Sequence, residues 1–217
     1  RKGEQMKEKN RFLALLLAMV MALGLMIPAA AAENPAPAED NSGKIVILHT
    51  NDVHCGIDQV TKDDAITGIG YAGVAAYKAE MEAAYGASSV TLVDAGDAIQ
   101  GGPIGTLTKG SAIVEIMNKT GYDLAIPGNH EFDYGMDNFL SLATEKAEYS
   151  YICSNFTDLD GKAVFEPYKM LTYGDVKVAY VGIDTPETFV KSTPTYFQND
   201  KGEYIYSLQQ GNDGKDL

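Results

Sequence analysis

The sequence predicts an α/β domain built on a largely parallel β-sheet. Short apolar, strand-like runs alternate with segments of helical periodicity at least three times, which is the order of strand–helix–strand units. Three apolar runs lead into loops rich in Asp, Asn, His and Gly, at Thr50–His54, Asp94–Gly101 and Gly128–Asp133. Because the carboxyl ends of parallel strands share one edge of a sheet, we expect these three loops to meet there.

The individual elements follow from local patterns. The nearly continuous apolar run 44–49 predicts a strand buried at the sheet centre. Apolar residues at helical spacing over 70–85, followed by Gly86, predict a helix with a glycine C-cap. The further expected elements are a strand at 89–93, a helix at 111–118 closed by Gly121, a short strand at 123–126, a helix at 136–147, a strand at 149–153, and a hairpin of 169–172 with 176–183.

Three segments divide the chain. Residues 1–32 combine a basic stretch, the 16-residue apolar run 12–27 and a small-residue end, which predicts a leader with a secretory signal peptide cut after Ala32. The run is shorter than the roughly 20 residues that span a bilayer, so an uncleaved membrane anchor is the weaker alternative. The Pro- and acid-rich composition of residues 33–43 predicts a linker. Residues 44–217 are expected to form the globular part. We therefore expect a secreted, periplasmic or cell-surface protein with no stable membrane span after cleavage.

Charge and cysteine content exclude some classes of protein. The net charge is −13, and because residues 1–32 contribute about +3, the remainder carries about −16. Such an acidic chain does not favour a nucleic acid polymer as partner. Two cysteines, Cys55 and Cys153, are too few for a disulfide scaffold or a zinc knot. Three alternatives stay open for them: a disulfide between the two, two free thiols, or Cys55 as an occasional metal ligand.

The polar loops carry candidate metal ligands. Asp52 and His54 stand one residue apart at a strand end, where an extended backbone would aim both side chains at one cation. Asp97 can bridge two metals with its two carboxylate oxygens. Asp94 is the competing candidate, but it lies nearer the strand and we assign it to structure. Asn129 offers a neutral amide oxygen.

The third loop also predicts an acid–base pair. His130 titrates near neutrality and is a natural general acid, and Asp133 is close enough in a tight turn to hold its imidazole. We interpret Glu131 as a capping or solvated residue. His49 should face away from Asp52 as a packed, hydrogen-bonded histidine.

Together these motifs closely resemble the calcineurin-like metallophosphoesterases, and within them the exported 5′-nucleotidase group, which includes UDP-sugar hydrolases and 2′,3′-cyclic-nucleotide phosphodiesterases. The resemblance is carried by ILHTNDVHCGI, GDAIQGGP and IPGNHEFD, and it extends through YICSNFTD and VAYVGIDTPET. Cys55 and Pro127 depart from the usual residues of the family, but neither substitution removes a donor atom.

The resemblance implies a metallophosphoesterase-type layered α/β fold, incomplete at the C-terminus. It implies two divalent metal ions, of zinc, manganese or iron, because mixed nitrogen and oxygen donors suit these metals better than calcium. Asp52 and His54 would bind the first metal, Asp97 would bridge both, and Asn129 would bind the second. Asn129 and His130 are also predicted to contact the substrate.

The implied reaction is hydrolysis of a phosphate ester, a nucleotide above all. Metal-bound hydroxide would attack phosphorus, and His130, steadied by Asp133, would assist the leaving group. Hydrolysis of a cyclic nucleotide or a UDP-sugar is an alternative within the family, and a non-catalytic secreted binding protein with a degenerate site is the alternative outside it. No histidine follows His130, so we expect an N-terminal part of a longer enzyme that is inactive by itself.

Overall fold

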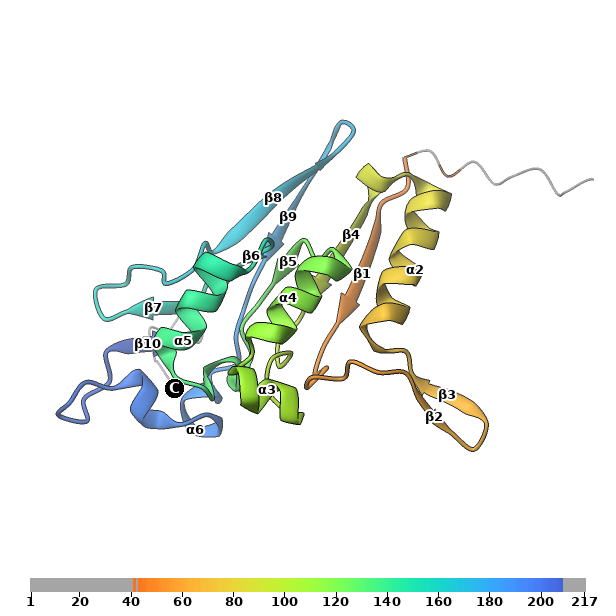
Figure 1. Ribbon diagram of the computed structural model, residues 1–217. Helices are drawn as coiled ribbons and strands as arrows, with labels where there is room; N and C mark the ends of the chain where they lie inside the picture. The colour runs from red at the N-terminus through yellow and green to blue at the C-terminus, as the bar shows by residue number, and fades with distance from the viewer. Residues whose placement is uncertain (1–40, 42, 209–217) are drawn as a thin grey trace, which may run out of the picture. The chain divides into compact units, whose positions relative to one another are not determined.

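A computed structural model of the protein describes residues 41 and 43–208 (Figure 1). The predicted leader and signal peptide, most of the predicted linker and the last nine residues lie outside the described residues. None of the helices in the described part is long and apolar enough to cross a membrane.

A four-stranded parallel sheet forms the centre of the described fold. Its order is β1 (Val46–Thr50), β4 (Val90–Asp94), β5 (Leu124–Ala125) and β6 (Ser150–Tyr151). Every neighbouring pair is parallel, and the last residues of β1 and β4, Thr50 and Asp94, are in register. The predicted α/β class and its parallel sheet are therefore confirmed, and the carboxyl ends of the strands meet at one edge.

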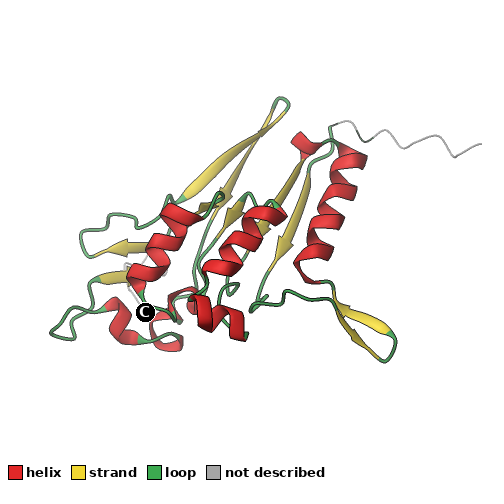
Figure 2. Ribbon diagram, in the orientation of Figure 1, coloured by secondary structure: helices red, strands yellow, loops and turns green. Residues whose placement is uncertain are grey.

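Three helices lie side by side over one face of this sheet (Figure 2). They are α2 (Gly70–Tyr85), α4 (Ser111–Thr120) and α5 (Met136–Ser141). The helix α2 occupies its predicted range, and α4 begins where predicted but ends at Thr120 instead of Asn118. The N–H of Gly121, in the left-handed conformation, closes α4 on the carbonyls of Met117 and Asn118. The predicted helix 136–147 is divided, because α5 continues as one π-helical segment, Leu142–Lys146.

Smaller elements surround the sheet. The antiparallel pairs are β2 (Val60–Lys62) with β3 (Ala65–Gly68), β7 (Phe156–Asp158) with β10 (Tyr206–Leu208), and the predicted hairpin β8 (Tyr168–Tyr173) with β9 (Val176–Val181). The remaining helical elements are short. They are the α-helices α3 (Pro103–Thr108) and α6 (Thr188–Lys191) and the 3-10 turns Ala87–Ser89, Asn129–Phe132 and Pro194–Phe197.

The prediction that β1 is a buried central strand is wrong. Within the described residues β1 is an edge strand, its residues alternate between half-buried and exposed, and Ile47 is 50% exposed. His49 is likewise exposed, so the expectation of a packed histidine is also wrong. The physical reason is that the helices cover the face of β1 that carries Leu48, whereas Ile47 and His49 point to the opposite face.

The core reaches directly beneath the third polar loop. Phe132 is fully buried and packs edge-on against Phe139, Phe156 and Phe197, with ring centroids 5.0–5.5 Å apart. Such aromatic contacts add stability beyond the burial of their area. Because Phe132 belongs to the 3-10 turn Asn129–Phe132, this packing holds that turn against the interior.

A buried carboxyl group lies just beyond β9. Asp184 is only 2% exposed, and its Oδ1 accepts a hydrogen bond of 2.9 Å from the Thr188 hydroxyl. Among the described residues no hydrogen-bond partner is found for its Oδ2. Burial raises the pKa of Asp184 to about 7, against the hydrogen bond from Thr188, which lowers it.

The raised pKa of Asp184 predicts a specific pH dependence of stability. The folded state prefers the neutral carboxyl group, so this contribution is fully present below about pH 4 and is lost as the pH rises through about 7. Asp184→Asn, a neutral isostere, should therefore gain in melting temperature relative to the unmutated protein between pH 4.5 and pH 8. The exposed Asp160→Asn is the control and should keep a constant difference. A constant difference for Asp184→Asn as well would contradict the prediction.

Candidate metal and catalytic site

The three polar loops are joined by hydrogen bonds at the edge of the sheet. The N–H of Asp52 donates to the carbonyl of Gly96 at 3.1 Å, and the N–H of His54 donates to the carbonyl of Asp97 at 2.9 Å. From the third loop, the N–H of His130 donates to Oδ1 of Asp97 at 2.8 Å. The loop that carries Asp97 is therefore the middle one, bound by the other two.

Three of the predicted metal ligands have a strained backbone. Asp52, His54 and Asp97 have φ values of 54°, 45° and 60°, in the left-handed region that residues with a Cβ rarely adopt. The extended geometry expected for Asp52 and His54 is therefore wrong. Their side chains still approach, with His54 Nε2 3.6 Å from Asp52 Oδ1, because the turn itself brings them together. Such strain concentrates at functional sites.

Two glycines allow the second and third loops to touch. A Cβ on Gly96, whose φ is +100°, would lie 2.7 Å from the backbone nitrogen of Gly128. A Cβ on Gly128 would lie 2.4 Å from Oδ1 of Asp97. Both distances are shorter than any ordinary van der Waals contact, so a side chain at either position would push the loops apart.

Glu131 ties these same two loops together, and the interpretation of it as capping or solvated missed this role. Its side chain is 1% exposed. Its carboxylate accepts hydrogen bonds from the N–H groups of Asp97 and Ala98, each at 2.8 Å, and more weakly from Ile99 at 3.4 Å. It also accepts a bond of 2.6 Å from Gly128 within its own turn, which is the capping part of the expectation. Burial raises the pKa of Glu131, although the bonds from Asp97 and Gly128 oppose this.

Asp94 lies outside the donor cluster. It is buried, its Oδ2 accepts a bond of 2.5 Å from the Thr50 hydroxyl, and its Oδ1 accepts one of 3.0 Å from the Gly96 N–H. These contacts hold the end of β4 to the end of β1, in line with the structural assignment.

His54, Asp97 and His130 form a cluster that could hold a metal ion. One donor atom from each lies within 4.8 Å of the others, and the rings of His54 and His130 are 5.1 Å apart. His54 Nδ1 lies 3.1 Å from the carbonyl oxygen of Gln100. With Nδ1 donating there, Nε2 keeps its lone pair for a metal, the usual arrangement of a ligating histidine. Two imidazoles and a carboxylate fit a divalent transition metal.

Asn129 directly precedes His130 in the 3-10 turn Asn129–Phe132, and it is buried. The structure therefore brings His54 and Asp97 into one cluster and sets Asn129 in the neighbouring loop. Asp52 lies outside that cluster, and its carboxylate is 3.6 Å from His54. The structure also places His130 among the possible donors, whereas the sequence predicted a catalytic role for that ring.

His130 and Asp133 form the predicted pair. The Nδ1 atom of His130 lies 2.6 Å from Oδ2 of Asp133, a distance typical of a strong charge-assisted bond. Burial lowers the pKa of His130, but the bond to Asp133 and the charges of Asp133, Asp97 and Glu131 together raise it more, so the net shift is upward. The ring thus retains its proton more readily near neutral pH.

The two cysteines are free and buried, which is the two-thiol alternative. The Cys55 thiol donates to the Ile99 carbonyl at 3.2 Å. A metal-ligand role for Cys55 therefore finds no support in its hydrogen bonding.

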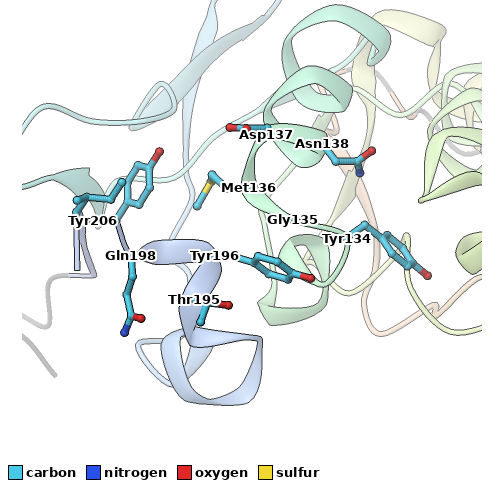
Figure 3. A pocket seen from close by; sticks show the side chains of 10 residues that line it. Tyr134, Gly135, Met136, Asp137, Asn138, Thr195, Tyr196, Gln198 and Tyr206 are labelled. Atoms are coloured by element: carbon cyan, nitrogen blue, oxygen red, sulfur yellow. The ribbon is translucent and has the colours of Figure 1, made fainter. Parts of the chain in front are cut away.

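An open hollow of about 510 Å³ lies beside α5, between the segment after Asp133 and the turn Pro194–Phe197 (Figure 3). The lining residues are Tyr134, Gly135, Met136, Asp137, Asn138, Thr195, Tyr196, Gln198, Ile205 and Tyr206. None of the candidate metal ligands is among them, so this hollow is separate from the donor cluster.

A parallel α/β sheet with imidazole and carboxylate donors at its carboxyl edge defines an α/β protein with a candidate metal site. The family model of the calcineurin-like phosphoesterases matches residues 45–208. The chain belongs to that family, which confirms the resemblance found in its motifs.

Curated relatives include 5′-nucleotidases. The chain is 36% identical to snake venom 5′-nucleotidase of Gloydius brevicauda over 163 aligned residues. This alignment covers 70% of the chain and 27% of the relative. It is 34% identical to the 5′-nucleotidase of Bos taurus, over 70% of the chain and 28% of the relative. It is 32% identical to silent protein UshA(0) of Salmonella typhimurium, over 82% and 32%. The chain thus spans about a third or less of the length of these relatives.

Solved structures share the fold. The 5′-nucleotidase precursor of Thermus thermophilus has a TM-score of 0.62 at 23% identity, over 78% of this chain and 32% of that one. The NAD nucleotidase of Haemophilus influenzae has a TM-score of 0.57 at 28% identity, over 67% and 27%.

The contacts of Glu131 predict a large cost for its removal. Glu131→Ala leaves the N–H groups of the two loops without their acceptor, so the free energy of unfolding in urea should fall by about 2–4 kcal/mol. Glu115→Ala, an exposed glutamate on α4, should change it by less than about 0.5 kcal/mol. Equal effects of the two substitutions would show that Glu131 does not hold the loops.

Proposed function

We propose that the protein is an exported, metal-dependent hydrolase that removes phosphate from 5′-nucleotides. The observation that carries this proposal is the approach of His54, Asp97 and His130 to within 4.8 Å at the carboxyl edge of a phosphoesterase fold. Family membership and curated relatives named 5′-nucleotidases support it.

The proposed ligands follow the donor chemistry of the loops. Asp52 and His54 would hold one cation, Asn129 would hold the second, and Asp97 would contribute to both. Zinc, manganese or iron suits this mixture of nitrogen and oxygen donors. Two such ions, when bound, would offset the charge of a phosphate group and lower the pKa of a water molecule.

The chain's own residues supply the proton. Because Asp133 occupies Nδ1 of His130, only Nε2 remains free to present a proton to the departing oxygen or, alternatively, to bind a metal. The bond to Asp133 favours the first role, since a carboxylate at Nδ1 orients the ring as a proton donor. The N–H of His130 donates to Oδ1 of Asp97, and Asn129 directly precedes His130 in the same turn, which supports both residues as contacts to the substrate phosphate.

The proposed organisation places this chemistry in the segment 44–217, as the first part of a phosphoesterase domain. Residues 1–32 are proposed as leader and cleaved signal peptide and 33–43 as linker, on the strength of the basic and apolar pattern. These sequence features support export of the enzyme and a small phosphate ester outside the cytoplasm as its substrate.

Removal of metal should abolish activity. The whole protein, dialysed against a chelator until no metal is detected, should no longer release phosphate from AMP, because the ions offset the substrate charge. Added Zn²⁺ or Mn²⁺ should restore the release. Assays on 2′,3′-cyclic AMP and UDP-glucose in parallel identify the preferred ester. Undiminished AMP hydrolysis in metal-free protein would refute the metal-dependent mechanism.

His130→Ala should separate the two roles open to Nε2. If the ring serves as general acid, turnover of AMP should fall on the order of 10²–10⁴-fold, with metal content close to that of the unmutated protein. Asp97→Ala is the matched comparison and should lose metal. A His130→Ala protein that loses its metal would identify the ring as a ligand and contradict the assignment as an acid.

A further inference from the structure

We propose that Ser192 is a positioning residue for the His130–Asp133 pair. The Ser192 hydroxyl donates to Oδ1 of Asp133 at 3.0 Å, while Oδ2 of the same carboxylate lies 2.6 Å from Nδ1 of His130. This inference rests on the proposed function, because it assigns Ser192 to the proton-donating pair of that site.

Binding at both oxygens fixes the carboxylate. A carboxylate with a single partner can rotate about its Cβ–Cγ bond, and the side chain of Asp133 is 21% exposed, so water could compete for it. With Ser192 on Oδ1, only Oδ2 is directed at His130. The plane of the imidazole, and with it the direction of Nε2, is then set before substrate binds, and small errors in that direction are costly in rate.

Ser192 is itself held firmly. It is 8% exposed, and its N–H donates to the carbonyl of Thr188 at 3.0 Å, at the end of α6. Thr188 is fully buried and its hydroxyl donates to Oδ1 of Asp184. The backbone of Asp184 exchanges two bonds with the Asn155 side chain, of 2.8 and 3.0 Å.

A continuous series of contacts therefore runs from the residues that follow β6 and β9, through α6, to the catalytic pair. Figure 1 shows α6 at the end of the sheet to which the strand arrows point, the end where the polar loops meet. Through these contacts Ser192 connects the side chain of Asp133, which lies on a separate loop, to residues at the ends of the strands.

A purely structural role makes a different prediction. If the Ser192 hydroxyl only stabilises the turn, its removal should lower stability and should reduce the rate equally for every substrate. If it positions the proton donor, its removal should matter most where the leaving oxygen needs a proton. The dependence of rate on the pKa of the leaving group separates the two.

The test uses the whole protein and aryl phosphates from p-nitrophenyl phosphate, a good leaving group, to phenyl phosphate, a poor one. Ser192→Ala removes the hydroxyl, and Ser192→Thr keeps it. Ser154→Ala is the matched control, because the Ser154 hydroxyl donates to the Gly182 backbone carbonyl at 2.7 Å, and within residues 43–208 no hydrogen bond joins it to His130 or Asp133. Melting temperatures report the fold of each variant, and Ser192→Gly replaces Ser192→Ala if the latter does not fold.

We expect Ser192→Ala to lose about 10-fold on phenyl phosphate, as residues that orient a ligand or acid commonly do, and less than about 2-fold on p-nitrophenyl phosphate. Ser192→Thr should recover most of the loss, and Ser154→Ala should show no dependence on the leaving group. An equal loss on both esters, or no loss, would overturn the proposal.

A second measurement does not depend on turnover. The Nδ1 proton of His130, assigned by its absence in His130→Ala, should be seen by NMR in the unmutated protein and in Ser192→Thr, and should exchange faster with solvent in Ser192→Ala. Unchanged exchange would overturn the positioning role. A protein that hydrolyses aryl phosphates but not AMP would refute the nucleotide substrate alone, and the Ser192 comparison would still decide this inference.

Discussion

The carboxylate of Glu131 is the interaction on which the arrangement of the site depends. It is buried beneath the site and accepts N–H groups from the loops that carry Asp97 and Gly128. A buried N–H without a partner is costly, so a single acceptor shared by both loops fixes their separation. Glu131 thus sets the distance between Asp97 and His130, although it is itself shielded from solvent.

This bond network also explains how the backbone sustains strain. The positive φ angles of Asp52, His54 and Asp97 cost energy, and they persist because each loop is hydrogen-bonded to the next. The contact of Gly96 with Gly128 brings the second and third loops close enough for this to happen. Strain and close packing produce the same result, which is a set of donors preorganised before any ion or substrate arrives.

The side chains of Phe132 and Ser192 support the residues of the candidate site. The ring of Phe132 is buried among other aromatic rings and holds the turn that carries His130. The hydroxyl of Ser192 approaches Asp133 from α6. The candidate site residues and the residues that support them therefore come from several segments of the chain, and the contacts between these segments fix their geometry.

The sequence by itself determined the class of fold, the helices predicted at 70–85 and 111–118, and the loops that carry the candidate site, because periodicity, glycine caps and polar motifs are properties of short segments. Only the tertiary structure decided the exposure of His49, the burial of Glu131 and the contact of Ser192 with Asp133. Glu131 reaches an N–H group 34 residues away, and Ser192 reaches a carboxylate 59 residues away. Burial and hydrogen bonds of this kind depend on which distant segments the fold brings together, and a local sequence pattern does not predict such contacts.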